Sequence, residues 1–482
     1  MILVLLGCAS GVDPIRPNVL LVSMDTVRYD RTSLAGSKDT TPNLRALAAE
    51  GVSWSSAYAV GNESVYSHAA VVTGRYPSEI AIPDYASFAL PDDVPTLAGV
   101  LGSYGYATGA FTGGGHVVAT FGFDKGFDTF VAAPGATRFG SFFESVPSAL
   151  AWIRGQEDPW FAFVHGYDAH SPYVQRGPFL HPWGTEGATP WLESLLADPL
   201  AVEQIRGHRW YPDRTPRDFT HAAGRDILGT DFYALPDTPR EGERTLELGE
   251  AQMAHVRNHY DSGVMVADFW LGVLLSHVNL ETTLVIVMSD HGEDVLDHGF
   301  MNHRAGLWDS TLHVPLVAAG PGFEPEVPRA GLVDLRSVLP TVLRAAGAKL
   351  PAGVTAPSLQ DLGRDDQAVE SGMVFAEGVM DTVSVRSGEA RLTFTAAKLA
   401  DGSPGLAQRA LDEGAQFYVD DQPVAFDERA EVLRQALVDW RAGLRLATVP
   451  GAPIPEAMRE EMRARGYWTP GAEPGAEPGA GR

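Results

Sequence analysis

Cysteine is almost absent from this chain, and positive charge is scarce. Cys8 is the single cysteine among 482 residues, which excludes an intrachain disulfide framework and zinc sites built from several thiolates. Lys and Arg number 36 against 61 Asp and Glu, for a formal net charge of −25. A chain this acidic lacks the basic surface that binds phosphate backbones, so we expect no nucleic-acid partner.

Long apolar runs are scarce as well. The apolar run over residues 1–7, before Cys8, is far shorter than the ~20 residues that a membrane-spanning helix needs. Leu5-Leu6-Gly7-Cys8 resembles a bacterial lipoprotein processing box. This resemblance implies cleavage before Cys8, a lipid on Cys8 and a tether through residue 16. It predicts a lipid-anchored protein of the bacterial cell envelope, facing the periplasm or the exterior. The alternative is a short buried strand at the N-terminus.

Two apolar runs predict strands that are buried on both faces. Residues 18–24 and 283–289 are almost wholly apolar, and each run is followed by an acid, Asp25 or Asp290. Further strands are expected at 106–112 and 160–165, and helices at 41–52, 95–104, 143–154 and 251–278. Strands that alternate with helices predict a doubly wound, mostly parallel α/β sheet, in which ligands bind at the carboxyl ends of the strands.

The remaining segments predict an insertion and a smaller subdomain. Residues 175–249 are rich in Pro, Gly, Arg, Trp and His without periodicity, which favours a substrate lid; a disordered spacer is the alternative. Strands expected at 373–376, 382–386 and 390–395 and a helix at 427–446 predict a C-terminal α+β subdomain over 373–448. The large domain would span 17–372, and 449–482 would be a tail, disordered towards its low-complexity end.

The residues that could carry chemistry lie near the predicted strand ends. Asp25, Asp290 and His291 supply two carboxylates and an imidazole, a donor set that suits a divalent metal. Ser64 precedes a small apolar helix, whose start could hold an oxyanion, and a metal at its hydroxyl would activate it as a nucleophile. His68 lies one helical turn further on. The alternatives are structural: capping of turns by the acids, an N-cap role for Ser64 and a core position for His68.

Over roughly residues 17–440, the chain resembles the sulfatase family of the alkaline phosphatase superfamily. The motifs that carry the resemblance are, in chain order, Thr41-Pro42-Asn43-Leu44, Thr73-Gly74-Arg75-Tyr76-Pro77, Tyr167-Asp168-Ala169-His170-Ser171-Pro172-Tyr173, Ser289-Asp290-His291-Gly292-Glu293 and His313-Val314-Pro315-Leu316. Each is weak by itself, whereas their order and spacing together are specific. The resemblance implies an alkaline-phosphatase-like fold and hydrolysis of an anionic ester.

The resemblance also implies a site. It predicts one divalent cation, calcium by family or else manganese, magnesium or zinc, held by Asp25, Asp290, His291 and Ser64. Ser64 would be the nucleophile. Three histidines, His68, His170 and His303, would balance charge or protonate the leaving group. Residues expected next to the ligands or the substrate are Thr26, which replaces the second acid of the usual pair, His116 and His298. Glu293 is expected to be solvated or to lie beside the ligands.

The segment Ser64-Val65-Tyr66-Ser67-His68 departs from the family pattern. The proline and arginine that direct oxidation to formylglycine are replaced by Tyr66 and His68, so we expect Ser64 to be unmodified. The chain is closer to a branch with Ser or Thr followed by Ser-His. An unmodified serine favours phosphate or phosphonate esters, because a serine sulfate must be attacked at sulfur, whereas the family name favours sulfate.

Three functions follow as hypotheses. The first is a metal-dependent hydrolase of sulfate or phosphate/phosphonate esters, acting on a small anionic ester or on a sulfated or phosphorylated glycan or lipid. The second is an envelope transferase of phosphoglycerol or phosphoethanolamine. The third is a catalytically inactive sulfatase-like protein that binds an anionic glycan.

Overall fold

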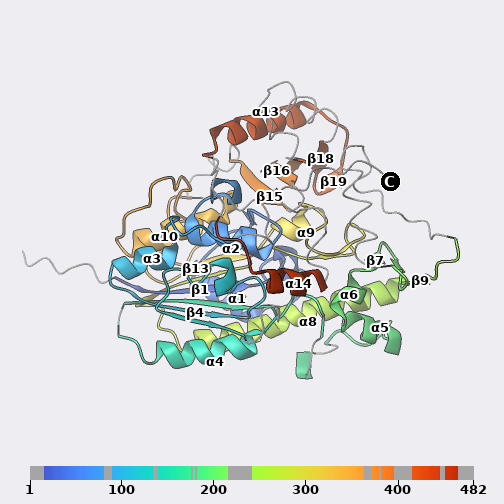
Figure 1. The fold of residues 1–482 in the computed structure, drawn as a ribbon, viewed down its shortest axis with the longest axis horizontal. Coiled ribbons are helices and arrows are strands. Elements are labelled where there is room, and N and C mark those ends of the chain that lie inside the picture. The colour runs from blue at the N-terminus through green and yellow to red at the C-terminus, as the bar shows by residue number, and fades with distance from the viewer. Residues whose placement is uncertain are drawn as a thin grey trace, which may run out of the picture.

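The fold comes from a computed structural model. It describes residues 16–80, 89–133, 139–157, 159–174, 177–179, 182–214, 241–362, 372–378, 382–395, 415–445 and 451–464. Within these ranges, a large sheet lies between two layers of helices, and a smaller sheet with its own helix lies above them (Figure 1). Cys8, the site of the expected lipid, lies outside the described residues.

A seven-stranded sheet forms the centre, in the order β2-β13-β10-β1-β6-β4-β5. β1 (Asn18–Met24) pairs in parallel with β10 (Thr283–Met288) and β6 (Trp160–Gly166). β4 (Ala107–Thr112) and β5 (Thr129–Ala132) continue the parallel part, whereas β13 (Leu316–Ala319) and β2 (Gly51–Ser53) are antiparallel. The prediction of a doubly wound, mostly parallel sheet is confirmed.

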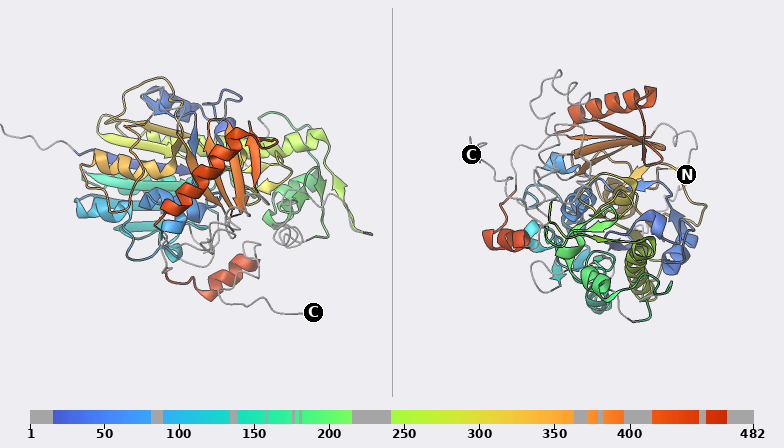
Figure 2. Two further views of the ribbon diagram at one scale, coloured as in Figure 1. Left: turned by 90° about the horizontal axis from the view of Figure 1, so that it is seen from above. Right: turned by 90° about the vertical axis from the view of Figure 1, so that its right-hand side faces the viewer.

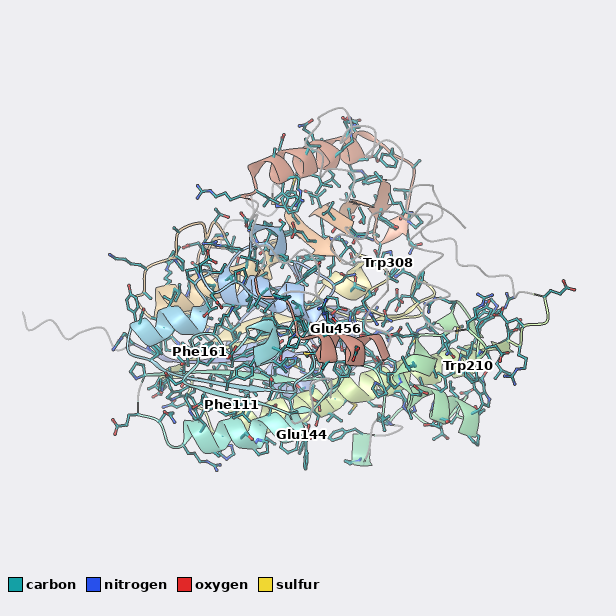
Figure 3. All side chains as sticks on the ribbon, viewed as in Figure 1. Phe111, Glu144, Phe161, Trp210, Trp308 and Glu456 are labelled. Atoms are coloured by element: carbon teal, nitrogen blue, oxygen red, sulfur yellow. The ribbon has the colours of Figure 1, made fainter. Side chains whose placement is uncertain are left out.

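Helices cover both faces of this sheet because its strands are apolar on both faces. Val19 and Leu21 of β1 belong to one buried cluster, with α2 (Ser64–Thr73), α3 (Leu97–Ser103) and α10 (Val338–Ala345). Leu20 and Val22 belong to the other, with α1 (Pro42–Ala49), α4 (Phe142–Ile153) and α8 (Glu250–Leu275). Figure 3 labels one aromatic side chain from each cluster, Phe161 and Phe111.

The helix expected over 41–52 is shorter than predicted. α1 ends at Ala49, and Gly51 already begins β2, which pairs with β13. A Cβ atom on Gly51 would lie 2.2 Å from the carbonyl oxygen of Ala318, so only glycine allows the two strands to approach this closely. The sequence pattern of the helix therefore gives no sign of the three-residue edge strand that follows it.

A separate antiparallel sheet forms the C-terminal subdomain. Its strands follow chain order: β15 (Val374–Gly378), β16 (Thr382–Ser387), β17 (Ala390–Thr395), β18 (Gln416–Val419) and β19 (Gln422–Pro423). Leu433 and Leu437 of α13 (Glu428–Gly443) pack on Val385 and Leu392 of this sheet. Figure 2 shows α13 as the outer layer of the subdomain. The α+β prediction is confirmed, although β18 and β19 were not foreseen.

The insertion over 175–249 contains regular elements that its composition did not predict. α5 (Pro190–Leu196) and α6 (Pro199–Val202) begin with a proline after a capping residue, Thr189 or Asp198. Three short strands form a sheet, β7 (Ile205–Arg206), β8 (Arg209–Trp210) and β9 (Leu246–Glu247). Apolar side chains of α5 join the cluster that contains α8. Residues 215–240 of the insertion lie outside the described ranges.

Several short elements complete the described fold. They are β3 (Ala57–Tyr58), which pairs with β14 (Val333–Asp334), β11 (Asp294–Val295), which pairs with β12 (Met301–Asn302), α9 (Asp309–Leu312) and α14 (Glu456–Ala464). α14 lies in the expected tail, yet Met458 and the preceding Ile454 are buried in the large domain. No helix among the described residues combines the length and the apolar character of a bilayer span. Residues 465–482, expected to be disordered, lie outside the description.

Candidate active site

Two neighbouring parallel strands place three candidate metal ligands side by side. Asp25 follows β1, and Asp290 and His291 follow β10, whose residues pair in register from Asn18 to Ser23. One ligand atom of each side chain lies within 4.8 Å of the others, and all three residues are buried. The carboxyl ends of adjacent parallel strands lie at the same edge, which explains how residues 265 positions apart in the chain meet.

Ser64 faces this group from the first residue of α2. Its hydroxyl donates to Asp25 Oδ2 over 3.2 Å and lies 3.3 Å from His291 Nε2. The N-cap position is occupied by Glu63, whose side chain makes no capping bond. The hydroxyl of Ser64 is therefore directed at the candidate ligands and does not cap its own helix.

The chemistry of the three side chains fits a divalent cation. Asp25 Oδ1 and Asp290 Oδ2 are buried, and neither accepts a hydrogen bond from any described residue. Burial, and after it the charge of Asp290, raises the pKa of Asp25 well above its usual value. His291 donates from Nδ1 to the carbonyl of Gly292 over 2.9 Å, which leaves the Nε2 lone pair for a ligand. A cation would pair all of these atoms.

Thr26 binds the side chain of Asp290 and the backbone of Asp25. Its N–H donates to Asp290 Oδ1 over 3.2 Å, and its hydroxyl donates to the carbonyl of Asp25 over 2.8 Å. Its φ of 58° lies in the left-handed region, which is strained for a β-branched residue. In this conformation the amide hydrogen is directed at the carboxylate of Asp290.

Two further histidines, His165 and His68, contact Asp25 and the backbone of Ser64. His165 Nε2 is 3.2 Å from Asp25 Oδ2. His68 Nδ1 donates to the carbonyl of Ser64 over 2.9 Å, and its Nε2 is 3.0 Å from Ser23 Oγ. The expected role of His68 at the leaving group does not agree with these contacts, because both ring nitrogens are engaged within the core. We treat His68 as a positioning residue that braces Ser64.

His170 and His303 stand on the other side of the candidate ligands. The His303 ring lies 4.2 Å from that of His291 and 5.3 Å from that of His170, between centroids. Burial disfavours a charged ring at His303, but hydrogen bonds and charge from Glu293 and Glu63 raise its pKa to about 9. Burial lowers the pKa of His170 to about 4. Near neutral pH the pair therefore offers one cationic and one neutral imidazole.

Glu293 is buried, so of its two expected positions, solvated or beside the ligands, the structure excludes the first. It accepts from the Tyr173 hydroxyl over 2.7 Å and lies 3.1 Å from His303 Nδ1. His116 Nδ1 lies 3.4 Å from Glu63, the residue before Ser64. His298, which was expected next to the ligands or the substrate, instead bridges Asp294 and Asp421 and stacks on Trp308, so it contacts none of the candidate ligands.

Sequence reasoning missed three residues of this site. His165 could have been found from strand register, because it lies opposite Ser23, two residues before Asp25. Glu63 directly precedes Ser64, but nothing in its neighbourhood indicated that it is buried. The third residue, Arg304, reaches the site from the loop after β12, with its Nε 3.7 Å from Glu63 Oε1. Its Nη2 also pairs with Glu203 of the insertion over 2.6 Å.

Taken together, these features define an α/β protein with a candidate divalent-metal centre and a serine at the carboxyl edge of its sheet. The chain belongs to the Sulfatase family, whose sequence model matches residues 17–348. It is 24% identical over 372 residues to the ulvan-active sulfatase of Formosa agariphila, covering 73% of this chain and 65% of that protein. Arylsulfatase K of Xenopus laevis is 30% identical over 228 residues, 45% of this chain and 39% of that protein. The chain thus spans less than two thirds of these two relatives.

Solved structures share the fold. A protein crystallised with its substrate D-glucosamine-2-N,6-O-disulfate superposes with a TM-score of 0.66 at 16% identity, covering 89% of this chain and 98% of that one. A phosphonate monoester hydrolase from Silicibacter pomeroyi gives 0.62 at 18% identity, covering 90% and 96%. These likenesses cover 89% and 90% of this chain and show its fold.

Proposed function

We propose that this protein hydrolyses sulfate, phosphate or phosphonate esters, with Ser64 as the nucleophile and one divalent cation as cofactor. The observation that carries the proposal is the position of the Ser64 hydroxyl, 3.2 Å from Asp25 and 3.3 Å from His291 at a buried helix start. Membership of the Sulfatase family supports it. The same contacts count against an inactive glycan-binding protein, because they bring a hydroxyl together with a donor set that suits a divalent metal.

The residues divide the work as follows. Asp25, Asp290, His291 and Ser64 would hold the cation, which when bound lowers the pKa of a contacting hydroxyl and polarises ester oxygens. Ser64 Oγ forms a bond to sulfur or phosphorus as the bond to the leaving oxygen breaks. The cationic ring of His303 balances negative charge on the ester, and His170 or His303 exchanges the proton that the leaving oxygen takes up. Water then hydrolyses the serine ester.

The substrate preference depends on whether Ser64 is modified. The lost proline and arginine of the modification pattern support an unmodified serine, and therefore phosphate or phosphonate esters. The shared fold with a phosphonate monoester hydrolase agrees with this preference. The named relatives favour sulfate esters, and one of them is called ulvan-active. We propose an anionic glycan or a smaller anionic ester as the substrate.

Replacement of Ser64 tests the nucleophile. With Ser64→Ala, we expect the turnover of nitrophenyl sulfate, nitrophenyl phosphate and the monoester nitrophenyl phenylphosphonate to fall by roughly 10³-fold or more, as when other serine nucleophiles are removed. Ser103→Ala, on the exposed face of α3, is the matched control and should retain full activity. The intact mass of the Ser64 peptide reports formylglycine directly. An S64A variant as active as the wild type would exclude this mechanism.

We also propose that Cys8 carries a lipid and anchors the protein to the cell envelope. The Leu5-Leu6-Gly7-Cys8 box supports this proposal. Incorporation of a labelled fatty acid in a bacterial host should be lost in Cys8→Ser. Equal labelling of the two proteins would show that the resemblance to a processing box is accidental.

A further inference from the structure

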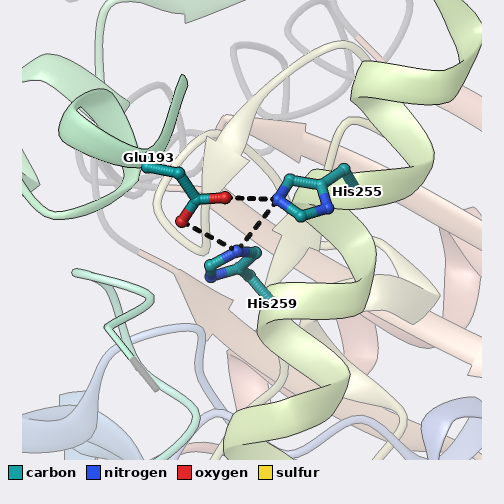
Figure 4. Close-up of side chains that lie close together, drawn as sticks. All are labelled: Glu193, His255 and His259. Atoms are coloured by element: carbon teal, nitrogen blue, oxygen red, sulfur yellow. Dashed lines mark hydrogen bonds and ion pairs between the residues drawn. The ribbon is translucent and has the colours of Figure 1, made fainter. Parts of the chain in front are cut away.

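A second group of side chains that could bind a metal lies between α5 of the insertion and α8 of the large domain. Glu193 comes from α5, and His255 and His259 lie one turn apart on the same face of α8 (Figure 4). The two imidazoles are buried, whereas the Glu193 side chain is 38% exposed. The group is therefore open to solvent from the side of α5.

The three side chains converge on one point. His255 Nε2 lies 2.6 Å from Glu193 Oε1, and His259 Nε2 lies 3.3 Å from Glu193 Oε2. The two Nε2 atoms are only 3.1 Å apart. Both rings thus aim the same nitrogen at the same carboxylate and at each other.

While Glu193 is ionised, no arrangement of protons on the two imidazoles makes all three of these contacts favourable. If both Nε2 atoms carry a hydrogen, two N–H groups face each other over 3.1 Å. If only His255 carries one, the lone pair of His259 faces a carboxylate oxygen, and the reverse holds if only His259 carries it. A cation between the three atoms makes every contact attractive, because both nitrogens and the carboxylate then present lone pairs to it.

A further contact fixes His259 in the orientation that a ligand needs. Its Nδ1 donates to the carbonyl of Tyr173 over 2.9 Å, which places the remaining lone pair on Nε2. Metal-binding histidines commonly make this bond with their other nitrogen, because it sets the tautomer and the ring plane.

From this geometry we propose a second metal site, formed by Glu193, His255 and His259, for a divalent transition metal such as Zn²⁺. Two imidazoles and one carboxylate, with a fourth position open to water, suit zinc better than calcium. The histidine spacing is that of zinc-binding helices, but Val256 stands where a hydrolytic site would carry a glutamate. The site is therefore structural, and it ties α5 of the insertion to α8.

The bound ion would also connect to the candidate active site. Tyr173, whose carbonyl orients His259, donates its hydroxyl to Glu293 over 2.7 Å, and Glu293 in turn contacts His303. The two sites share the residue Tyr173, through its backbone carbonyl on one side and its hydroxyl on the other, yet zinc binding to the second site does not depend on the proposed hydrolysis.

Zinc titration tests the second site by itself. In a metal-stripped Asp290→Asn background, which disables the first site, we expect calorimetry to find one Zn²⁺ per chain and no Ca²⁺ at the same concentration. Glu193→Gln and His255→Gln should each weaken Zn²⁺ binding by more than the ~10–100-fold that loss of an outer-shell partner causes. His277→Gln, just beyond α8, is the matched control and should bind Zn²⁺ unchanged.

Folding is checked by comparing unfolding midpoints in EDTA, where the Glu193→Gln variant should match its background. Anomalous scattering at the zinc edge should place the ion between Glu193, His255 and His259. Absence of Zn²⁺ binding in the Asp290→Asn background, or binding that neither substitution weakens, would overturn the proposal and leave a simple ion pair.

Discussion

At the scale of the residue, the candidate active site concentrates like charges that the fold alone does not neutralise. Asp25 and Asp290 are buried, and each has one oxygen that accepts no hydrogen bond from a described residue. Burial, and after it the charge of Asp290, raises the pKa of Asp25, whereas at Asp290 the neighbouring histidines outweigh burial and lower the pKa. Ionised Asp25 therefore destabilises the metal-free protein, and binding of a cation would recover the lost free energy. Function and stability are opposed at this residue.

Replacement of Asp25 by asparagine should separate these effects. We expect Asp25→Asn to raise the free energy of unfolding in EDTA by about 1–2 kcal/mol, because it removes the carboxyl whose ionisation burial opposes and adds a donor beside Asp290. The amide oxygen can still accept from the Ser64 hydroxyl. Thermal unfolding with and without added Ca²⁺ measures both consequences, since the Ca²⁺-induced rise in Tm should disappear. A less stable metal-free variant would contradict this account.

At the scale of the element, close backbone approach positions the antiparallel edge of the sheet. Gly51 allows β2 to lie against β13, and β13 pairs with the strand that carries Asp290. The edge strands thus support one half of the metal-binding group. Strand pairing at this edge depends on one position that lacks a side chain.

Gly51→Ala tests that dependence. The added methyl group would meet the backbone of Ala318, so we expect a loss of about 1–3 kcal/mol of unfolding free energy, as for other overpacked sites. Gly443→Ala, at the end of α13, is the control. A Cβ added there would meet no neighbouring atom within 4 Å, so this variant should be neutral or slightly stabilising. Chemical denaturation compares the two variants, and equal stabilities would refute the steric argument.

The elements that the sequence predicted were those whose pattern is local. The continuous apolar runs of β1 and β10 and the long periodicity of α8 were sufficient, and the acids at the strand ends led to Asp25 and Asp290. β2 and the pair β18 and β19 are two to four residues long, and they exist through pairing with distant strands. His165 was missed for the same reason, because only the register of β6 against β1 places it beside Asp25.

At the scale of the whole molecule, several polar contacts join the large domain and the C-terminal subdomain, and His298 makes one of them. It lies between Asp294 of the large domain, over 2.8 Å, and Asp421 of the subdomain, over 3.1 Å. Burial disfavours the charged ring, but the two carboxylates prevail and raise the pKa of His298 to about 9. The imidazolium is therefore the form that holds the two units together.

The stability of this junction should depend on pH. Because the folded-state pKa is raised, the contribution of His298 is complete below about pH 6.5, the unfolded value, and is lost as the pH rises through about 9. Unfolding free energies at pH 6 and pH 10 should differ more in the wild type than in His298→Gln. His277→Gln, exposed after α8, should behave as the wild type. An identical pH dependence in all three proteins would count against this junction.

The return of the chain to the large domain after α13 has a topological consequence. Leu359 is buried in the large domain before the subdomain begins, and Ile454 and Met458 are buried there after it ends. The subdomain is thus an insertion between two segments of the chain that are both packed in the large domain. If the subdomain unfolded partially, both flanking segments would remain packed in the large domain. For the same reason, a shorter linker between residues 362 and 451 would be sufficient to connect them.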